Sequence, residues 1–271
     1  MSARCQRSGT PASAEAVRAA PRRRGGAAGP GGHQARFRGD RHRLRTVGVL
    51  DILDQRVGPS GTVVGLDREP TMLEWARASL NARGLAHVRL VEGTGQATGL
   101  PSSNFDVVHG RLVLVHTSQP ADIVAEMVRL ARPGGSVCVQ DVDCMSWLCE
   151  PEHPAWSELV SLLSRITSID LLVGRKLPAL LRQAGLEEVG CDAHAYVWDH
   201  THPYQTLLID LVGIVREHLM SLGMITAERL DRLTEELAEH LDHPDTFVIH
   251  PLLMQAWGRK PSEPGEAGTG P

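Results

Sequence analysis

The chain has 271 residues, of which 42% are hydrophobic and 22% are charged, and its formal net charge is −4. This composition suits one globular domain with a core, with or without an attached cap. No apolar run reaches about 18 residues, so no membrane span is indicated. The five cysteines include no Cys-x-x-Cys pair and predict no disulfide framework. We therefore expect a cytoplasmic protein without a membrane partner.

The charge is unevenly distributed along the chain. The first 47 residues hold eleven arginines, no lysine and two acidic residues, whereas the remainder carries a net charge of −13. Residues 1–46 include the Pro/Gly-rich stretch 21–32 and show no helix or strand period over a useful length. We predict that residues 1–46 are disordered. Nucleic-acid binding is the less favoured interpretation, because the arginines are not regularly interleaved with aromatic residues.

The same segment has a second possible explanation. The chain contains only two lysines against 26 arginines, which indicates GC-rich coding. GC-rich DNA that is read in a wrong frame yields mostly Arg, Ala, Gly and Pro. Our hypothesis is that residues 1–46 are a frameshifted or mis-started segment.

From Gly48 onward, helical and extended patterns alternate. The alternation predicts an α/β fold with a doubly wound, mostly parallel sheet. We expect helices at 49–57, 71–83 and 120–131, and strands at 62–66, 87–91, 105–109 and 136–140. A tight turn at Arg132–Gly135 precedes the last of these strands.

The regular alternation of helical and extended patterns ends after residue 141. The patterns predict helices at 156–169 and 176–184, a strand at 189–198, a helical stretch at 206–241 broken near Gly223, and a final strand at 246–257. We therefore expect one domain over residues 47–260, with cap helices at about 154–169 and 204–242. Residues 261–271 are Pro/Gly/Glu-rich and are expected to form a disordered tail.

The strongest chemical signal is the stretch 61–69, Gly-Thr-Val-Val-Gly-Leu-Asp-Arg-Glu. A short apolar run with β-branched residues is typical of a buried parallel strand. Ligands in open α/β sheets bind beyond the carboxyl ends of such strands, where this run places Asp67. A carboxylate there can accept hydrogen bonds from both hydroxyls of an adenosine ribose. The alternative is that Asp67 only caps the helix that begins near Thr71.

Four motifs in order resemble class I S-adenosylmethionine-dependent methyltransferases. Residues 63–73 are similar to the second motif of that family, and 104–109 to its fourth strand. Residues 126–135, Glu-Met-Val-Arg-Leu-Ala-Arg-Pro-Gly-Gly, resemble the helix and turn before strand five. The stretches from 189 and from 246 to 260 resemble its closing antiparallel hairpin. The resemblance covers roughly residues 48–260 and implies a Rossmann-like methyltransferase fold that uses S-adenosylmethionine to methylate a small molecule.

The resemblance also implies cofactor-binding positions. Asp67 matches the ribose-binding acid, and the adenine would lie beside Arg68 and Met72, although Met72 equally suits plain helix–sheet packing. Arg111 follows strand four, where a bidentate arginine could hold the methionine carboxylate, or it is a surface arginine. The loop after strand three lacks the acidic residue that the family usually has there. Another residue of that loop would therefore have to bind the adenine amino group. The candidates are Thr94, Gly95, Gln96 and Ala97.

Catalytic residues are weakly indicated. His109 and His116 are candidate general bases because the pKa of histidine is near neutrality. Asp141 and Asp143 follow strand five and are equally weak candidates. We expect no metal site, because no cysteine or acid pair completes a ligand set with His194, His200 and His202.

The chain departs from the family at its first motif. Residues 39–48 contain neither an apolar strand nor the paired-glycine loop that lets backbone approach the cofactor. We therefore expect the first strand of the sheet to be absent. The alternative to an active enzyme is a truncated or degenerate relative that is weak or inactive, or a binding scaffold. A nicotinamide dehydrogenase would also require the missing glycine motif.

Overall fold

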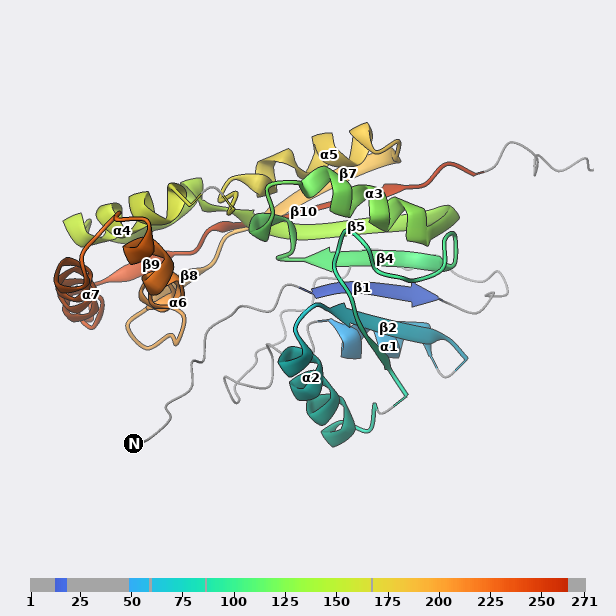
Figure 1. Ribbon diagram of the computed structural model, residues 1–271, viewed down its shortest axis with the longest axis horizontal. Coiled ribbons are helices and arrows are strands. Elements are labelled where there is room, and N and C mark those ends of the chain that lie inside the picture. Colours follow the sequence, from blue (N-terminus) through green and yellow to red (C-terminus); the bar gives the residue numbers. More distant parts are fainter. Residues whose placement is uncertain (1–12, 19–48, 59, 86, 167, 263–271) are drawn as a thin grey trace, which may run out of the picture.

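The computed structural model describes residues 13–18, 49–58, 60–85, 87–166 and 168–262. A seven-stranded sheet forms the larger part, and a smaller part contains three helices and a three-stranded sheet (Figure 1). The ten strands are β1 Ser13–Arg18, β2 Thr62–Asp67, β3 Arg89–Glu92, β4 Phe105–Arg111, β5 Ala131–Asp143, β6 Leu148–Glu150, β7 Glu187–His194, β8 Val197–Asp199, β9 Phe247–Ile249 and β10 Leu252–Arg259. The α-helices are α1 Leu50–Val57, α2 Pro70–Ala82, α3 Pro120–Leu130, α4 Pro154–Ser164, α5 Leu177–Gln183, α6 Leu207–Ser221 and α7 Ala227–Leu241.

The large sheet has the strand order β3-β2-β1-β4-β5-β10-β7. The pairs β2–β3 and β4–β5 are parallel, and β10 is antiparallel to both β5 and β7. Helices follow β2 and β4, which is the pattern of a doubly wound sheet. The predicted α/β fold with a late antiparallel hairpin is therefore confirmed.

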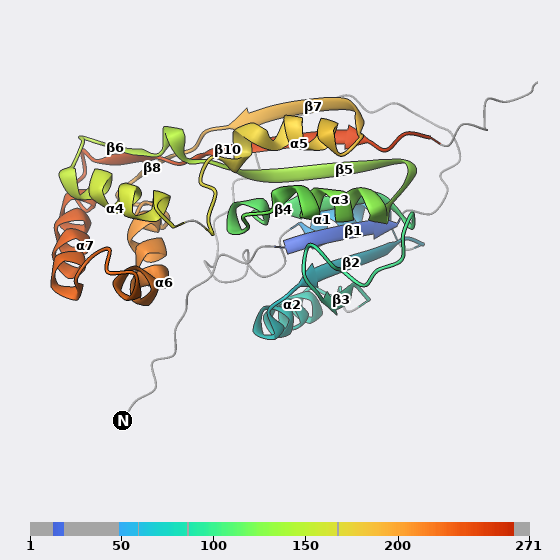
Figure 2. The same cartoon turned by 45° about the horizontal axis from the view of Figure 1, so that its top comes forward.

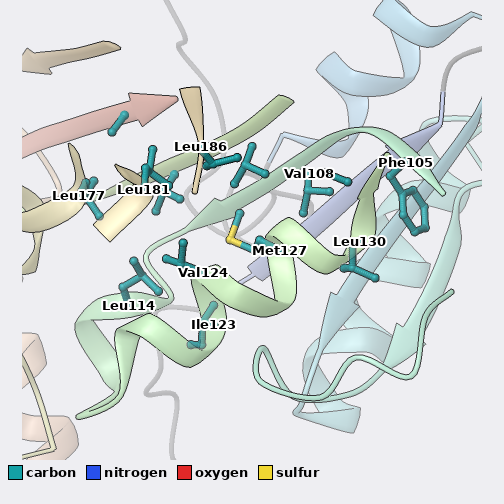
Figure 3. Packing of buried hydrophobic residues seen from close by; sticks show 14 of the residues in the cluster. Phe105, Val108, Leu114, Ile123, Val124, Met127, Leu130, Leu177, Leu181 and Leu186 are labelled. Carbon is teal, nitrogen blue, oxygen red and sulfur yellow. The ribbon is translucent and has the colours of Figure 1, made fainter. Parts of the chain in front are cut away.

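Alternate residues of β2 supply two different cores, because successive side chains of a strand point to opposite faces. Val64 lies in the core that α3 and α5 cover, and Val63 lies in the core that α1 and α2 cover. Figure 3 shows Val124 and Met127 of α3 in the same buried cluster as Val108 of β4. These buried side chains fix the sheet between two helical layers, so the carboxyl ends of its strands are held in place.

The structure contradicts the expectation that the first strand is absent. Ser13–Arg18 forms the central strand β1, with five residues of β1 paired to β2 and five paired to β4. Both pairings are antiparallel, so β1 runs against its two neighbours. A physical reason is that β2 and β4 would otherwise each expose a row of unpaired backbone groups. The expectation of disorder for residues 1–46 is thus wrong for these six residues, and its remainder lies outside the described residues.

The central position of β1 predicts slow hydrogen exchange of its backbone amides. The amides of Ala14–Val17 should exchange much more slowly than those of a free peptide, because β1 is hydrogen-bonded to strands on both sides. Hydrogen–deuterium exchange followed by mass spectrometry measures this directly. Exchange of these amides at the free-peptide rate would contradict the central strand and restore the expectation of a disordered segment.

Two predicted strands are each divided in the structure. The predicted strand 189–198 is β7 followed by β8, and the predicted strand 246–257 is β9 followed by β10. The second division occurs at His250–Pro251, because a proline has no N–H to donate to a neighbouring strand. As a result, β8 and β9 leave the large sheet and pair with β6 in the order β6-β9-β8.

The cap is built from α4, α6 and α7, whose leucine-rich faces share one core (Leu159, Leu208, Leu219, Leu233 and Leu237). The expected break of the helical stretch 206–241 is confirmed, with Gly223 at φ 65° between α6 and α7. The helix expected at 156–169 ends earlier, at Ser164. The arrowhead of β4 points toward the side of the molecule where the cap helices lie (Figure 1). Figure 2 shows α4, α6 and α7 together at that side.

Two further expectations can be compared with the described residues. No helix among them has the combination of length and apolar character that crossing a lipid bilayer requires. Of the tail that was expected to be disordered at 261–271, residues 263–271 lie outside the described part of the chain.

Candidate functional site

The candidate site lies at one edge of the large sheet. Parallel pairing brings the carboxyl ends of β2 and β3 together, and it does the same for β4 and β5. Asp67 ends β2, the loop 93–98 follows β3, and Arg111 ends β4. Because β1 is antiparallel, its first residue Ser13 lies at this edge, paired with Arg111. The sequence-predicted cofactor residues are therefore gathered at one edge.

Asp67 is held in a defined orientation at the end of β2. Its side chain is buried, and its Oδ1 accepts a hydrogen bond of 2.9 Å from the backbone N–H of Glu69. Burial raises the pKa of Asp67, while the backbone N–H groups of Glu69 and Arg68 lower it. Glu69 is the N-cap residue of α2, and the bond from its N–H to Asp67 also suits the alternative that Asp67 caps this helix, so both roles stay predictions. A buried carboxylate of this kind is stabilised when a ligand donates further hydrogen bonds to it.

The loop after β3 lies beside Asp67. The backbone N–H of Gly93 donates to the backbone carbonyl of Asp67 at 3.1 Å. Within the loop, the N–H of Ala97 donates to Thr94 Oγ1 at 3.2 Å. A Cβ on Gly95 would meet the side chain of Ile123 at 3.2 Å, so this glycine lets the loop approach α3 closely. The side chains of Thr94, Gln96 and Ala97 are exposed and accessible to a ligand.

A charged network anchors the end of this loop to α3, and the sequence analysis missed it. Glu126 Oε1 accepts hydrogen bonds from the backbone and the hydroxyl of Thr98. Glu126 Oε2 accepts from Arg129 Nε at 2.6 Å, and Arg129 Nη2 donates to the carbonyl of Leu100 at 2.8 Å. The Arg129 hydrogen bond, together with those of Thr98, lowers the pKa of Glu126 to about 2. The network therefore fixes the loop that flanks Asp67.

Substituting Glu126 tests this anchoring. Glu126→Gln should lower the free energy of unfolding at pH 7 by about 1.5–3 kcal/mol, because hydrogen bonds to a charged group are lost. The pKa is lower in the folded protein, so the stabilisation is present above the ordinary glutamate pKa and is lost as pH falls toward about 2. Urea unfolding at pH 7 and pH 3 measures both effects. Glu74→Gln, an exposed change on α2, is the control, and equal stability of the two variants at pH 7 would contradict the role of Glu126.

Arg68 and Met72 lie close to Asp67 but differ in exposure. Arg68 pairs with Glu69 at 3.3 Å, and its side chain is 67% exposed. Met72 is half-buried near the start of α2. Their positions after β2 match those predicted, and their adenine contacts remain predictions.

The histidines near β4 are placed differently from one another. His109 lies within β4, beside Cys138 of β5, and is half-buried. His116 ends the short 3-10 helix Leu114–His116, where its surface is exposed. Desolvation of the ring and then the charge of Arg68 lower the pKa of His116 below its ordinary value. Of the two candidate bases, His116 is thus the one that a ligand can reach.

Asp141 has a structural role in this arrangement. It is fully buried, and its oxygens accept hydrogen bonds from the backbone N–H groups of Leu114, Val115 and Val142. Burial raises the pKa of Asp141 to about 6. These bonds hold the segment that follows Arg111 against β5, and they leave Asp141 inaccessible to a methyl acceptor.

Asp143 is also engaged with protein groups. Its two oxygens accept hydrogen bonds of 2.6 and 2.8 Å from Nε and Nη2 of Arg175, and Oδ1 also accepts from the backbone of Met145. The Arg175 hydrogen bonds lower the pKa of Asp143. This bidentate pair ties the end of β5 to the segment before α5, so we assign Asp143 a structural role as well.

Arg111 carries an unusual polar group at this edge. Its Nε is buried and has no hydrogen-bond partner among the described residues. A buried donor without a partner costs free energy, which a bound acceptor group would recover. The predicted role of Arg111 in binding an anionic oxygen fits this feature.

The histidines that were rejected as metal ligands belong to a different region. His194 ends β7, and His200 and His202 follow β8. Among the described residues, no three His, Cys, Asp or Glu side chains are grouped as metal ligands would be. The expectation of no metal site stays a prediction.

Comparison with known proteins bears on the same part of the chain. Residues 46–139 match the methyltransferase domain family. This part of the chain is similar to that family. It contains Asp67, the loop 93–98 and Arg111, and it ends within β5.

Curated relatives agree with this assignment. A demethylmenaquinone methyltransferase of Anoxybacillus flavithermus is 38% identical over 85 residues, which are 31% of this chain and 36% of the relative. Another, from Listeria welshimeri, is 26% identical over 114 residues, or 42% of this chain and 46% of the relative. The chain thus matches less than half the length of these relatives.

Solved structures give weaker likenesses. A putative methyltransferase from Bacillus halodurans has a TM-score of 0.47 at 19% identity, covering 73% of this chain and 83% of that one. A putative sarcosine dimethylglycine methyltransferase from Galdieria sulphuraria has a TM-score of 0.45 at 15% identity, covering 80% and 76%. The fold assignment therefore rests on the strand order and the family match.

The residues at the edge suit the adenosyl part of S-adenosylmethionine. Asp67 offers a buried carboxylate for hydroxyl donors, and the exposed loop 93–98 lies next to it. The buried Nε of Arg111 suits an anionic oxygen further along the same edge. The segment that leads into α1, where the family has its glycine loop, lies outside the described residues.

Proposed function

We propose that the protein binds S-adenosylmethionine and transfers its methyl group to a small molecule. The observation that carries the proposal is the buried Asp67 at the carboxyl end of β2, beside the anchored loop 93–98. A carboxylate at this place accepts hydrogen bonds from two vicinal ribose hydroxyls, and the neighbouring loop meets the adenine. The family match over residues 46–139 supports the same assignment.

The chain's own groups would act mainly by positioning. Asp67 would fix the ribose, Arg111 would bind the carboxylate of the methionine part, and Met72 would contact the adenine. The bound donor supplies an electrophilic methyl group on a positively charged sulfur. A nucleophilic atom of the acceptor would take this methyl group, and the electron pair of the broken carbon–sulfur bond would stay on sulfur. Alignment of the reacting atoms supplies most of the rate in such a displacement, so few side chains need chemical activity.

Residues outside the matched domain would select the methyl acceptor. The family match ends at residue 139, whereas α4, α6, α7 and the small sheet come later in the chain. The curated relatives are named for demethylmenaquinone, which supports a small-molecule acceptor. Because less than half of each relative is matched, the proposal extends only to that class of acceptor.

One observation favours a second candidate, a relative with weak or no activity. The central strand β1 is antiparallel to β2 and β4, so its carboxyl end lies at the edge opposite Asp67. A glycine turn following such a strand could not face the cofactor. In this candidate the chain binds the adenosyl part weakly and serves as a binding scaffold.

Titration calorimetry separates these functions from dinucleotide binding. S-adenosylhomocysteine should bind the full chain in a saturable manner, whereas NAD should not compete with it. Binding together with transfer of a labelled methyl group to a small molecule supports the enzyme, and binding without any transfer supports the scaffold. Binding of NAD instead of S-adenosylhomocysteine would refute both.

A further inference from the structure

The chain bends at Leu112 and forms the β4 turn (residues 112–116), directly after Arg111 at the end of β4. Leu112 has a φ of 52°, in the left-handed region, where the Cβ of an L-residue comes too close to backbone oxygen. Among the described residues, two other non-glycine residues have a positive φ, Ser103 and Glu188. Strained backbone of this kind persists only where surrounding contacts impose it, and it is enriched at functional sites.

Leu112 differs from the other two residues in its place in the fold. Ser103 lies two residues before β4, and Glu188 is the second residue of β7. β7 is antiparallel to β10, which is antiparallel to β5, so β7 runs in the same direction as β4 and β5. Ser103 and Glu188 therefore lie at the edge of the sheet opposite Asp67. Of the three residues, Leu112 is the one at the edge that holds Asp67 and Arg111.

Hydrogen bonds to β5 hold the β4 turn in its strained conformation. The backbone N–H of Leu112 donates to the carbonyl of Gln140 at 2.8 Å. The carboxylate of Asp141 is fully buried, and its Oδ2 accepts from the backbone N–H groups of Leu114 and Val115 at 2.8 and 3.2 Å. These bonds are made while φ of Leu112 is positive, so they offset the strain at that residue.

The β4 turn connects two parts of the proposed donor site. It begins directly after Arg111, whose buried Nε has no hydrogen-bond partner among the described residues. It ends at His116, whose pKa is lowered by desolvation of the ring and then by the charge of Arg68. Arg68 directly follows Asp67, so the turn reaches from Arg111 toward the carboxylate that we assign to the ribose.

We propose that Leu112 is a positioning residue, whose left-handed turn, held by Asp141, fixes Arg111 in the orientation that binds the carboxylate of the donor's methionine part. A guanidinium that is already oriented loses less side-chain freedom when it binds a carboxylate. The inference rests on the proposed function, because it assigns a residue that sets the donor affinity of that site. Leu112 acts through Arg111 and need not touch the donor.

Binding of S-adenosylhomocysteine to the full chain, measured by titration calorimetry, tests the proposal. Leu112→Val should weaken binding by about tenfold, because a β-branched side chain disfavours a positive φ still more strongly. Leu112→Gly should bind nearly as the parent does, because glycine adopts this conformation without strain. Glu188→Val is the matched control: it places valine at a φ of 51° at the opposite edge and should leave the affinity unchanged.

A double-mutant cycle with Arg111→Met shows whether Leu112 acts through the guanidinium. Arg111→Met keeps an unbranched side chain without the guanidinium and should weaken S-adenosylhomocysteine binding by at least about tenfold. In that background, Leu112→Val should weaken binding by less than about a further threefold, because two residues that act as a unit are not additive. A merely structural effect of Leu112→Val would weaken binding equally in both backgrounds.

Asp141→Asn tests the same turn from β5. Asparagine keeps one oxygen but places an NH2 donor where the second carboxylate oxygen accepted, so it cannot satisfy the same N–H groups. It should also weaken binding by about tenfold in the parent and by less than about threefold beside Arg111→Met. Thermal unfolding shows which variants are folded, and Asp141→Asn decides the question if Leu112→Val does not fold.

The outcomes separate this inference from the proposed function. Parent-like affinity of folded Leu112→Val, equal losses in both backgrounds, or an equal loss in Glu188→Val would overturn the positioning role. An equal loss in Leu112→Gly, or unchanged affinity of Arg111→Met, would overturn it as well. In each of these cases the parent still binds S-adenosylhomocysteine and the proposed function stands. If the parent does not bind it, the proposed function fails and the positioning role fails with it.

Discussion

Asp67→Ala should weaken S-adenosylhomocysteine binding by about 100-fold or more, because two hydrogen bonds to a charged carboxylate are lost. Asp67 is buried at the end of β2, and its Oδ1 already accepts from the backbone of Glu69. The carboxylate is therefore oriented before any ligand binds, which lowers the entropic cost of binding. Titration calorimetry of the variant and the parent measures the change.

Two further variants make the Asp67 experiment specific. Asp67→Asn retains an oxygen for the Glu69 N–H but lacks the charge, so its affinity should lie between those of the parent and Asp67→Ala. Glu74→Ala, an exposed change on α2, should bind as the parent does. Unchanged affinity in a folded Asp67→Ala protein would refute the ribose assignment.

Replacing residues 1–47 with an apolar strand and a Gly-x-Gly-x-Gly turn should raise both cofactor affinity and methyl transfer by at least about tenfold. The present β1 is antiparallel to β2 and β4, so its carboxyl end lies far from Asp67. A parallel strand would place its carboxyl end beside Asp67, and the glycines would let backbone N–H groups approach the methionine part of the donor. Calorimetry and a labelled-methyl assay measure the two gains.

A matched chimera tells whether the glycines are responsible. The same replacement with alanines in place of the turn glycines should keep the strand but lose most of the gain, because Cβ atoms block close approach. Tight cofactor binding by the natural chain, with no gain in affinity or methyl transfer in either chimera, would contradict this account. It would mean that another segment supplies the backbone that approaches the methionine part of the donor. The comparison of the natural chain with the two chimeras also tests the hypothesis that residues 1–46 are frameshifted.

Much of the sheet edge could be predicted from the sequence, because its strands are short apolar runs flanked by turn residues. Val63 and Val64 predict β2 and the position of Asp67, and Gly84 ends α2 with a φ of 74°. The strand β1 was missed because Ser-Ala-Glu-Ala-Val-Arg has one β-branched residue and no apolar alternation of useful length. Its pairing comes from the backbone groups of β2 and β4, which leave no trace in the sequence of β1 itself.

Other features were not predictable because they join residues that are distant in the chain. The carboxylate of Glu126 anchors Thr98, 28 residues earlier, and no local pattern links them. Trp198 and His250 meet only because β8 and β9 pair outside the large sheet. A proline after His250 was the available signal, since Pro251 interrupts the predicted final strand.

The candidate bases show that the position of a residue in the sequence does not by itself establish a catalytic role. Asp141 and Asp143 were placed correctly at the end of β5, but their oxygens are occupied by backbone N–H groups and by Arg175. Sequence position indicates which edge of the sheet an acid reaches. It does not indicate which groups of the protein already satisfy that acid.

The most direct test of the central claim is an experimental structure of the full chain in complex with S-adenosylhomocysteine. We predict that both Asp67 carboxylate oxygens lie within hydrogen-bond distance of the two ribose hydroxyls, with the adenine against the loop 93–98. A ribose bound elsewhere, with Asp67 contacting only the backbone of its own turn, would contradict the account.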